Sequence, residues 1–148
     1  MRPRLILAAV LFMISSLALA QTDKRVDATI TIDNVGATAY VLTDAEGASV
    51  AEVGVENAAW TLQVGERYRV VNNGELLFHP LELRSDTDVL LAQGNPEGML
   101  EGDAEINFLS DDDGVTFTLT PELAKLLTTY RCTYHSAMTG PIVVDTAP

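Results

Sequence analysis

The sequence has 148 residues, with 21 acidic and nine basic side chains and a formal net charge of −12. This acidic balance argues against nucleic acid or an anionic membrane as a partner, and it favours a partner with a basic surface. The length fits a single domain with one hydrophobic core.

The first twenty residues have the pattern of a secretory signal peptide. A basic start is followed by an apolar run over residues 5–17 and by a small-residue cleavage site that ends at Ala20. The apolar run is short for a bilayer span, so a retained anchor helix is the weaker alternative. Cleavage after Ala20 predicts a periplasmic protein without membrane insertion. The remaining residues, 21–148, are expected to form one domain with a formal charge of −14.

Cys132 is the only cysteine of the chain. Exported proteins usually carry cysteines in pairs, so a single cysteine in an exported domain needs a reason. Its thiol could be buried and free, could form an intermolecular disulfide, or could bind a metal as a thiolate. The cysteine count leaves these three interpretations open.

Alternating apolar and polar residues predict a series of short strands. The predicted strands cover residues 26–33, 38–42, 49–55, 60–64, 67–71, 76–83, 115–120, 128–132 and 141–145. In the third of these, Val53 and Val55 are expected to point inward. Short strands at short intervals indicate an all-β sandwich or barrel.

Asn73 and Gly74 form a strong hairpin signal, because both residue types tolerate positive φ. The chain is therefore expected to return through residues 76–83, with Leu77 and His79 on the apolar face of the returning strand. The next residue, Pro80, cannot donate a hydrogen bond to a β-ladder. An edge or a bulge is therefore expected beside the histidine.

Residues 84–114 are rich in acidic residues, glycine and asparagine and predict a long excursion between strands. One or two short strands are expected within it, at the short apolar pieces 89–91 and 106–108. The acidic side chains are expected to form a solvated face. One short helix is predicted over 121–127, with Thr120 as its N-cap, directly before the strand that carries Cys132.

A thiol, an imidazole and a thioether lie within seven residues, at Cys132, His135 and Met138. His79 is the only other histidine and could supply a second imidazole from the end of another strand. One thiolate and two imidazoles with a weak axial thioether form the ligand set of blue copper electron-transfer sites. Tetrahedral zinc is an alternative, but a dedicated fourth ligand is missing.

Each candidate ligand also has an ordinary structural interpretation. His79 alone would be a core or edge histidine, and Met138 alone would be a core residue. These interpretations weaken together, because the few soft ligands of the chain fall at compatible strand ends. A metal-free interaction domain with Cys132 as a buried thiol is a further alternative. We do not expect an enzyme, since two histidines cannot build a second copper centre.

The chain resembles the cupredoxins, the small blue copper proteins of the plastocyanin and amicyanin type. The resemblance covers roughly residues 60–145, and its most specific part is the pattern Tyr130-x-Cys132-x-x-His135-x-x-Met138-x-Gly140-x-Ile142-x-Val144. A second matching stretch, residues 65–73, leads to His79. The two residues between His135 and Met138 are most similar to the short loop of amicyanin.

The resemblance implies a Greek-key β-sandwich with one type 1 copper ion at one end. It implies that the metal ligands are His79, Cys132, His135 and Met138. The expected function is that of a soluble, monomeric one-electron carrier, whose redox protein partner has a basic docking surface. The alternative is a periplasmic copper carrier or storage protein without a redox role.

Two positions depart from the family pattern. Relatives commonly have asparagine after the first histidine ligand, where its side chain braces the ligand loop and its backbone N–H donates to the cysteine sulfur. Pro80 can do neither. The proline often found between the cysteine and the second histidine is also absent, since Thr133 and Tyr134 stand there. The resemblance therefore implies a reduction potential that is shifted relative to family members.

Overall fold

The computed structural model describes residues 24–74, 76–94 and 97–146. The expected export signal, residues 1–20, lies outside this part of the chain. Among the described residues, no helix combines the length and the apolar character needed to cross a membrane.

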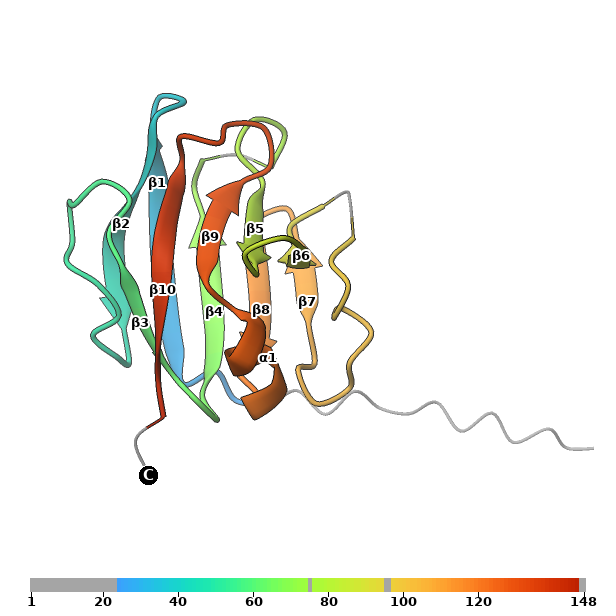
Figure 1. The fold of residues 1–148 in the computed structure, drawn as a ribbon. Coiled ribbons are helices and arrows are strands. Elements are labelled where there is room, and N and C mark those ends of the chain that lie inside the picture. Colours follow the sequence, from blue (N-terminus) through green and yellow to red (C-terminus); the bar gives the residue numbers. More distant parts are fainter. Residues whose placement is uncertain (1–23, 75, 95–96, 147–148) are drawn as a thin grey trace, which may run out of the picture.

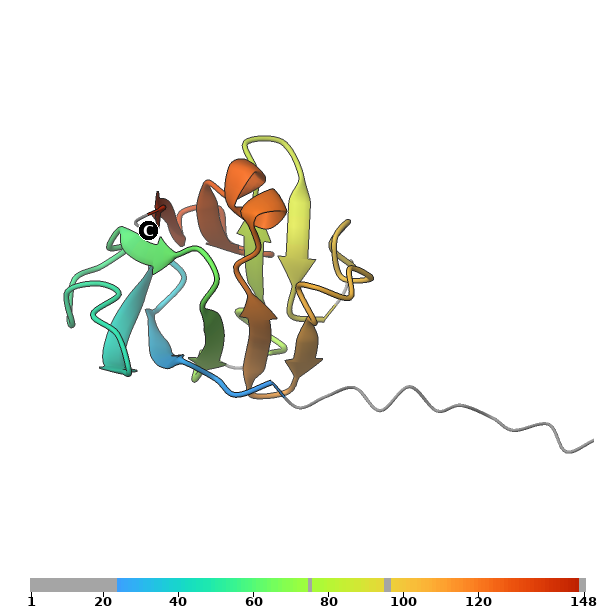
Figure 2. The ribbon, with the colours of Figure 1, turned by 90° about the horizontal axis from the view of Figure 1, so that it is seen from below.

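The described residues form two five-stranded sheets that face one another (Figure 1, Figure 2). The strands of the first sheet, in spatial order, are β2 (Ala39–Glu46), β1 (Ala28–Val35), β4 (Arg67–Asn72), β8 (Gly114–Thr118) and β7 (Leu109–Asp111). The strands of the second are β3 (Trp60–Gln63), β10 (Thr139–Asp145), β9 (Thr129–Cys132), β5 (Leu81–Arg84) and β6 (Val89–Ala92). A mostly β chain in a sandwich-like arrangement was predicted from the alternation of apolar residues, and the structure confirms it.

Each sheet combines antiparallel pairs with one parallel pair. β1 pairs in parallel with β4, and β3 pairs in parallel with β10. Parallel neighbours cannot be joined by a tight hairpin, so the connections between them must pass over to the other sheet or around its edge. The two sheets are therefore tied together by the path of the chain as well as by their core.

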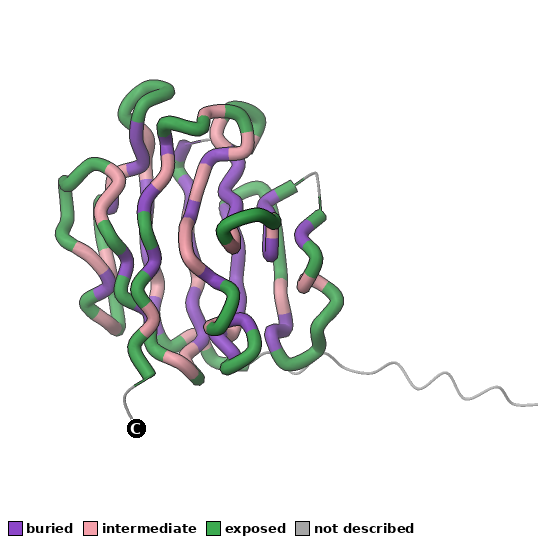
Figure 3. Tube along the Cα trace, in the orientation of Figure 1, coloured by how far each residue is buried: buried purple, intermediate pink, exposed green. Residues whose placement is uncertain are grey.

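The core lies between the sheets and is continuous along their length (Figure 3). β1 shows how the sequence pattern produces it, since Ala28, Ile30 and Ile32 are buried while the residues between them are partly exposed. The second sheet contributes a stacked aromatic pair, Trp60 and Tyr130, whose ring centroids lie 4.0 Å apart at an interplanar angle of 16°. This pair links β9 to β3 across β10, the strand that lies between them.

The single predicted helix is confirmed as α1 (Pro121–Leu126). The Oγ1 of Thr120 accepts a hydrogen bond from the backbone N–H of Leu123 at 3.2 Å, and Pro121 occupies the first turn. An N-cap side chain satisfies a backbone donor that the helix itself leaves unpaired. Leu123 is buried in the core and holds the helix there. β9 begins shortly after α1, at Thr129.

The strand predicted over residues 49–55 is wrong. Val53 and Val55, expected to point inward, are 57% and 39% exposed. Gly54 has a φ of 81°, which interrupts an extended conformation between the two valines. The segment contacts β2 through one backbone hydrogen bond, from the Gly54 N–H to the Leu42 carbonyl at 2.9 Å, and an isolated bridge between Val41 and Glu56 follows it.

The strand pieces of the acidic excursion fall partly where the sequence placed them. The piece at 89–91 is confirmed within β6. The piece at 106–108 is wrong, because the strand there is β7, which begins at Leu109. Ile106 is buried but belongs to no strand. Its apolar character therefore predicted a buried side chain correctly and a strand wrongly.

The hairpin predicted at Asn73 and Gly74 is also wrong. A turn does form, since Asn72 Oδ1 accepts a hydrogen bond from the Gly74 N–H at 3.0 Å. However, β4 and β5 belong to different sheets, so the chain crosses the sandwich after this turn. Leu77, expected on the apolar face, is 80% exposed on the crossing segment. Turn chemistry bends the chain but does not choose the strand with which it pairs.

The edge or bulge predicted at Pro80 is wrong. β5 begins one residue later, at Leu81, and is paired on both sides, with β9 and with β6. The proline precedes the ladder, so the missing N–H costs β5 no hydrogen bond. His79 therefore lies on the crossing segment, directly before a central strand.

Candidate metal centre

Three of the four predicted ligands meet at the end of the sandwich where β9 terminates. The nitrogen and sulfur atoms of His79, Cys132 and His135 all lie within 4.8 Å of one another. The Cys132 Sγ is 3.8 Å from His79 Nδ1 and 3.5 Å from His135 Nδ1. The imidazole rings lie side by side, with centroids 4.8 Å apart. The sulfur is fully buried and the two histidines are half-buried, so the cluster opens to solvent on the imidazole side.

The loop between β9 and β10 closes tightly on itself. The Cys132 N–H donates to the Met138 carbonyl at 3.0 Å, and the Met138 N–H donates to the His135 carbonyl at 3.0 Å. Cys132 and Met138 are both fully buried, whereas Tyr134 between them is 62% exposed. The loop is therefore compact, and its two sulfur-containing side chains are buried in the protein.

The segment that carries His79 is held by buried donors. The His79 carbonyl accepts hydrogen bonds from the Tyr40 hydroxyl at 2.5 Å and from Asn72 Nδ2 at 2.8 Å. The preceding carbonyl, of Phe78, accepts a long hydrogen bond from the Cys132 Sγ at 3.9 Å. Burial raises the pKa of Tyr40 well above its usual range, and the nearby Cys132 adds to this shift. The Tyr40 hydroxyl therefore stays protonated and acts as a donor.

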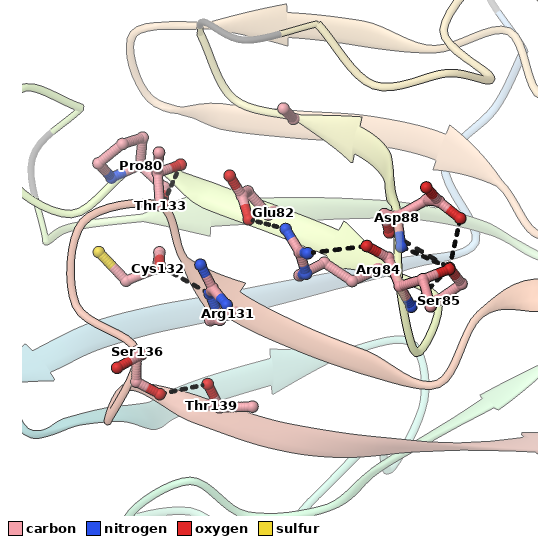
Figure 4. A network of polar contacts seen from close by, with 12 residues as sticks. Pro80, Glu82, Arg84, Ser85, Asp88, Arg131, Cys132, Thr133, Ser136 and Thr139 are labelled. Atoms are coloured by element: carbon pink, nitrogen blue, oxygen red, sulfur yellow. Dashed lines mark hydrogen bonds and ion pairs between the residues drawn. The ribbon is translucent and has the colours of Figure 1, made fainter.

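Pro80 braces the ligand loop after all, although its side chain lacks polar atoms. The Thr133 N–H donates to the Pro80 carbonyl at 3.0 Å, and the Thr133 Oγ1 approaches the same oxygen at 3.4 Å (Figure 4). Thr133 directly follows Cys132, so this contact joins the two ligand-bearing segments. Pro80 therefore connects the two segments through its backbone carbonyl and not through its side chain.

A buried glutamine extends the support of the crossing segment. Gln93 is fully buried, and its Oε1 accepts a hydrogen bond from Asn72 Nδ2 at 2.9 Å. Its Nε2 donates to the carbonyls of Asp111 and Asp112 at 3.2 and 3.3 Å. No sequence pattern indicates this role, because Gln93 is distant from Asn72 in the chain and lies in the acidic excursion.

Charged side chains near the ligand strands are paired away from the cluster. Arg84 and Glu82 form an ion pair at 2.7 Å, in which Glu82 is only 3% exposed (Figure 4). Glu82 alternates along β5 with the core residues Leu81 and Leu83 and lies opposite Arg131 of β9. The pair therefore occupies the outer face of the sheet that bears the ligands.

The surface around the cluster is apolar. Leu77, Phe78 and Tyr134 are 80%, 59% and 62% exposed, and all three belong to the two ligand-bearing segments. A cavity of about 240 Å³ lies between these segments. It is lined by Leu76, Leu77, Pro80, Gln93, Gly94 and Tyr134. Exposed apolar side chains gathered in one place are typical of interaction surfaces.

No protein-family model, curated protein or solved structure matches this chain. A thiol and two imidazoles at these separations could bind a metal ion. The donor set fits a borderline-soft transition metal. Met138, the predicted thioether ligand, is buried in the same loop as Cys132 and His135.

Proposed function

We propose that this protein is an exported, cupredoxin-like electron carrier that binds one type 1 copper ion through His79, Cys132, His135 and Met138. The observation that carries the proposal is the Cys132 sulfur, which lies buried between two imidazole nitrogens at 3.5 and 3.8 Å. The Greek-key arrangement of the family is compatible with the strand order. Residues 1–20, with their secretory pattern, support export to the periplasm.

The bound metal would supply a couple between Cu(I) and Cu(II). The contribution of the chain is to bury the thiolate, to hold the imidazoles from two separate segments and to keep water from the sulfur. The hydrogen bonds within the 132–138 loop and those to the His79 carbonyl serve this purpose. A site that stays in place when its charge changes has little to reorganise during electron transfer.

The apolar surface near the imidazoles supports a role in brief encounters with a redox protein. Leu77, Phe78 and Tyr134 would let a partner approach the half-buried histidines without displacing charged groups. The acidic side chains elsewhere would attract a basic docking surface. Residues 21–148 carry 21 acidic and seven basic side chains, so the net charge that would attract such a partner is strongly negative.

The proposal predicts that adding copper(II) to the protein without residues 1–20 gives an intense visible absorption. Titration followed by visible spectroscopy and electron paramagnetic resonance would measure it, with a stoichiometry of one ion per chain.

Zinc(II) competition identifies the preferred metal. Rapid electron self-exchange supports a carrier of electrons, whereas tight binding of both oxidation states with negligible exchange indicates a copper carrier. Absence of the visible band would contradict the copper proposal.

Electron exchange with a basic redox protein should slow as ionic strength rises. For cytochrome c as the probe, we expect about a tenfold lower rate when the salt concentration increases from 10 to 200 mM, because salt screens the steering charges. Stopped-flow absorption measures the rate. A small uncharged reductant is the control, and its rate should not change. Equal rates with cytochrome c at both salt concentrations would remove the acidic surface from the proposal.

A further inference from the structure

Tyr40 occupies an unusual position relative to the metal centre. It belongs to β2, in the sheet that carries none of the candidate ligands, and it is 1% exposed. It nevertheless connects by hydrogen bonds to both segments that do carry them. Neither connection could be seen in the sequence, since β2 is far from both segments along the chain.

The first connection runs through the side chain. The Tyr40 hydroxyl donates to the carbonyl of His79, the ligand on the crossing segment. That carbonyl also accepts from Asn72, so its two lone pairs are both used within the protein. Breaking one of these bonds would leave a polar group unpaired in a buried place, which opposes rotation of the His79 peptide.

The second connection runs through the backbone and Asn57. The Tyr40 N–H donates to Asn57 Oδ1 at 3.1 Å, and Asn57 Nδ2 donates to the Ala137 carbonyl at 3.0 Å. Ala137 directly precedes Met138 in the ligand loop. Asn57 has a φ of 50°, a left-handed conformation that asparagine tolerates better than most residues. The Asn57 N–H also donates to the Tyr40 carbonyl at 2.8 Å, which fixes the two residues together.

We propose that Tyr40 and Asn57 are positioning residues that set the separation between the His79 segment and the Cys132–Met138 loop. Tyr40 holds the first segment by its hydroxyl, and Asn57 holds the second by its amide. Tyr40 acts from β2, and Asn57 acts from the connection between β2 and β3, so the pair ties both ligand segments to β2. This inference rests on the proposed metal site, although it depends neither on the identity of the metal nor on electron transfer.

Cobalt(II) is a suitable probe, because its absorption reports thiolate coordination and its paramagnetism shifts the proton resonances of each ligand. Tyr40→Phe keeps the aromatic ring and removes the hydroxyl. We expect about tenfold weaker cobalt binding, in the range found when groups that orient metal ligands are lost. The largest changes in paramagnetic shift should fall on the His79 ring protons.

Tyr68→Phe is the matched control. Tyr68 is also 1% exposed, and its hydroxyl donates to Glu66 at 2.7 Å and accepts from the Gln63 N–H at 2.8 Å. These partners lie near the β3–β4 turn, away from the ligand segments. The variant should lose thermal stability much as Tyr40→Phe does, while its cobalt affinity stays within twofold of that of the unaltered protein.

Asn57→Gly tests the second connection. Glycine adopts the positive φ of this position readily, so the backbone conformation is retained. The three side-chain hydrogen bonds of Asn57, with Tyr40, Thr38 and Ala137, are lost. We expect cobalt binding to weaken about tenfold here as well. The paramagnetic shifts should now change at Met138 and His135, with little change at His79. This variant keeps the inference testable if Tyr40→Phe does not fold.

Two results would overturn the inference. The first is that Tyr40→Phe and Asn57→Gly both bind cobalt with an affinity within twofold of that of the control, Tyr68→Phe. The other is the absence of cobalt binding by the unaltered protein. Failure of the electron-carrier proposal would give a different set of results. The copper-loaded protein would then show no visible band or no electron self-exchange, while both variants would still weaken cobalt binding.

Discussion

Replacing Cys132 with serine is expected to abolish the visible absorption of the copper-loaded protein completely. The band requires a thiolate bound to copper, and a serine hydroxyl cannot supply the sulfur electrons from which the transition starts. Cys132 is the only cysteine, so no other residue can take its place. Titration with copper(II) followed by visible absorption measures the effect.

Ser136→Ala is the control for Cys132→Ser. Ser136 lies in the same loop with an exposed side chain, and its contact with Thr139 involves its backbone carbonyl. The visible band should therefore keep its intensity and position in this variant. Circular dichroism of each variant verifies that the protein is folded. A band that survives in folded Cys132→Ser would place the copper at another site.

Gly140→Ala is expected to lower the free energy of unfolding by about 3 kcal/mol, the cost of inserting an atom into a packed core. Gly140 lies directly opposite Tyr130 in the β9–β10 pair. A Cβ at Gly140 would overlap the phenol oxygen and ring carbons of Tyr130. The ring cannot move away freely, because it stacks on Trp60 and its hydroxyl donates to the Ala58 carbonyl at 2.7 Å. Urea unfolding monitored by Trp60 fluorescence measures the loss.

Gly102→Ala provides the comparison for Gly140→Ala. A Cβ at Gly102 would meet no atom within 4 Å, so this substitution should change the free energy of unfolding by less than about 0.5 kcal/mol. The glycine of the ligand-loop pattern is thus expected to be necessary for packing and not for flexibility. Equal stability of the two variants would show that Tyr130 can relax without loss.

The local part of the site was predictable from the sequence because its geometry is local. The spacing of Cys132, His135 and Met138 allows one loop to present all three side chains. His79 was reached differently, as the only other histidine, and the structure places it beside the thiol. Its route there was predicted wrongly, since the Asn73-Gly74 turn starts a crossing between sheets and not a hairpin.

The support of the site was not predictable, because it depends on contacts between segments that are remote in the chain. Tyr40 and Gln93 carry no sequence signal that distinguishes them from other buried residues. The false strand over residues 49–55 has the same origin: alternation at Val53 and Val55 suggested a buried face where no neighbouring strand covers them. The periodicity of apolar residues indicates which secondary structure a segment can form, and tertiary packing decides whether the segment forms it.

The parallel pairing of β3 with β10 has a consequence for the order of folding. Trp60 pairs with Ile142, so β3 has to wait for a strand made much later in the chain, and such long-range pairing is slow. The ligand loop lies immediately before β10 and closes only when that strand is in place. In the oxidising compartment to which we propose that the protein is exported, the Cys132 thiol would until then be open to oxidants or to a second chain. Rapid binding of the proposed metal ion would therefore protect the newly made protein as well as complete its site.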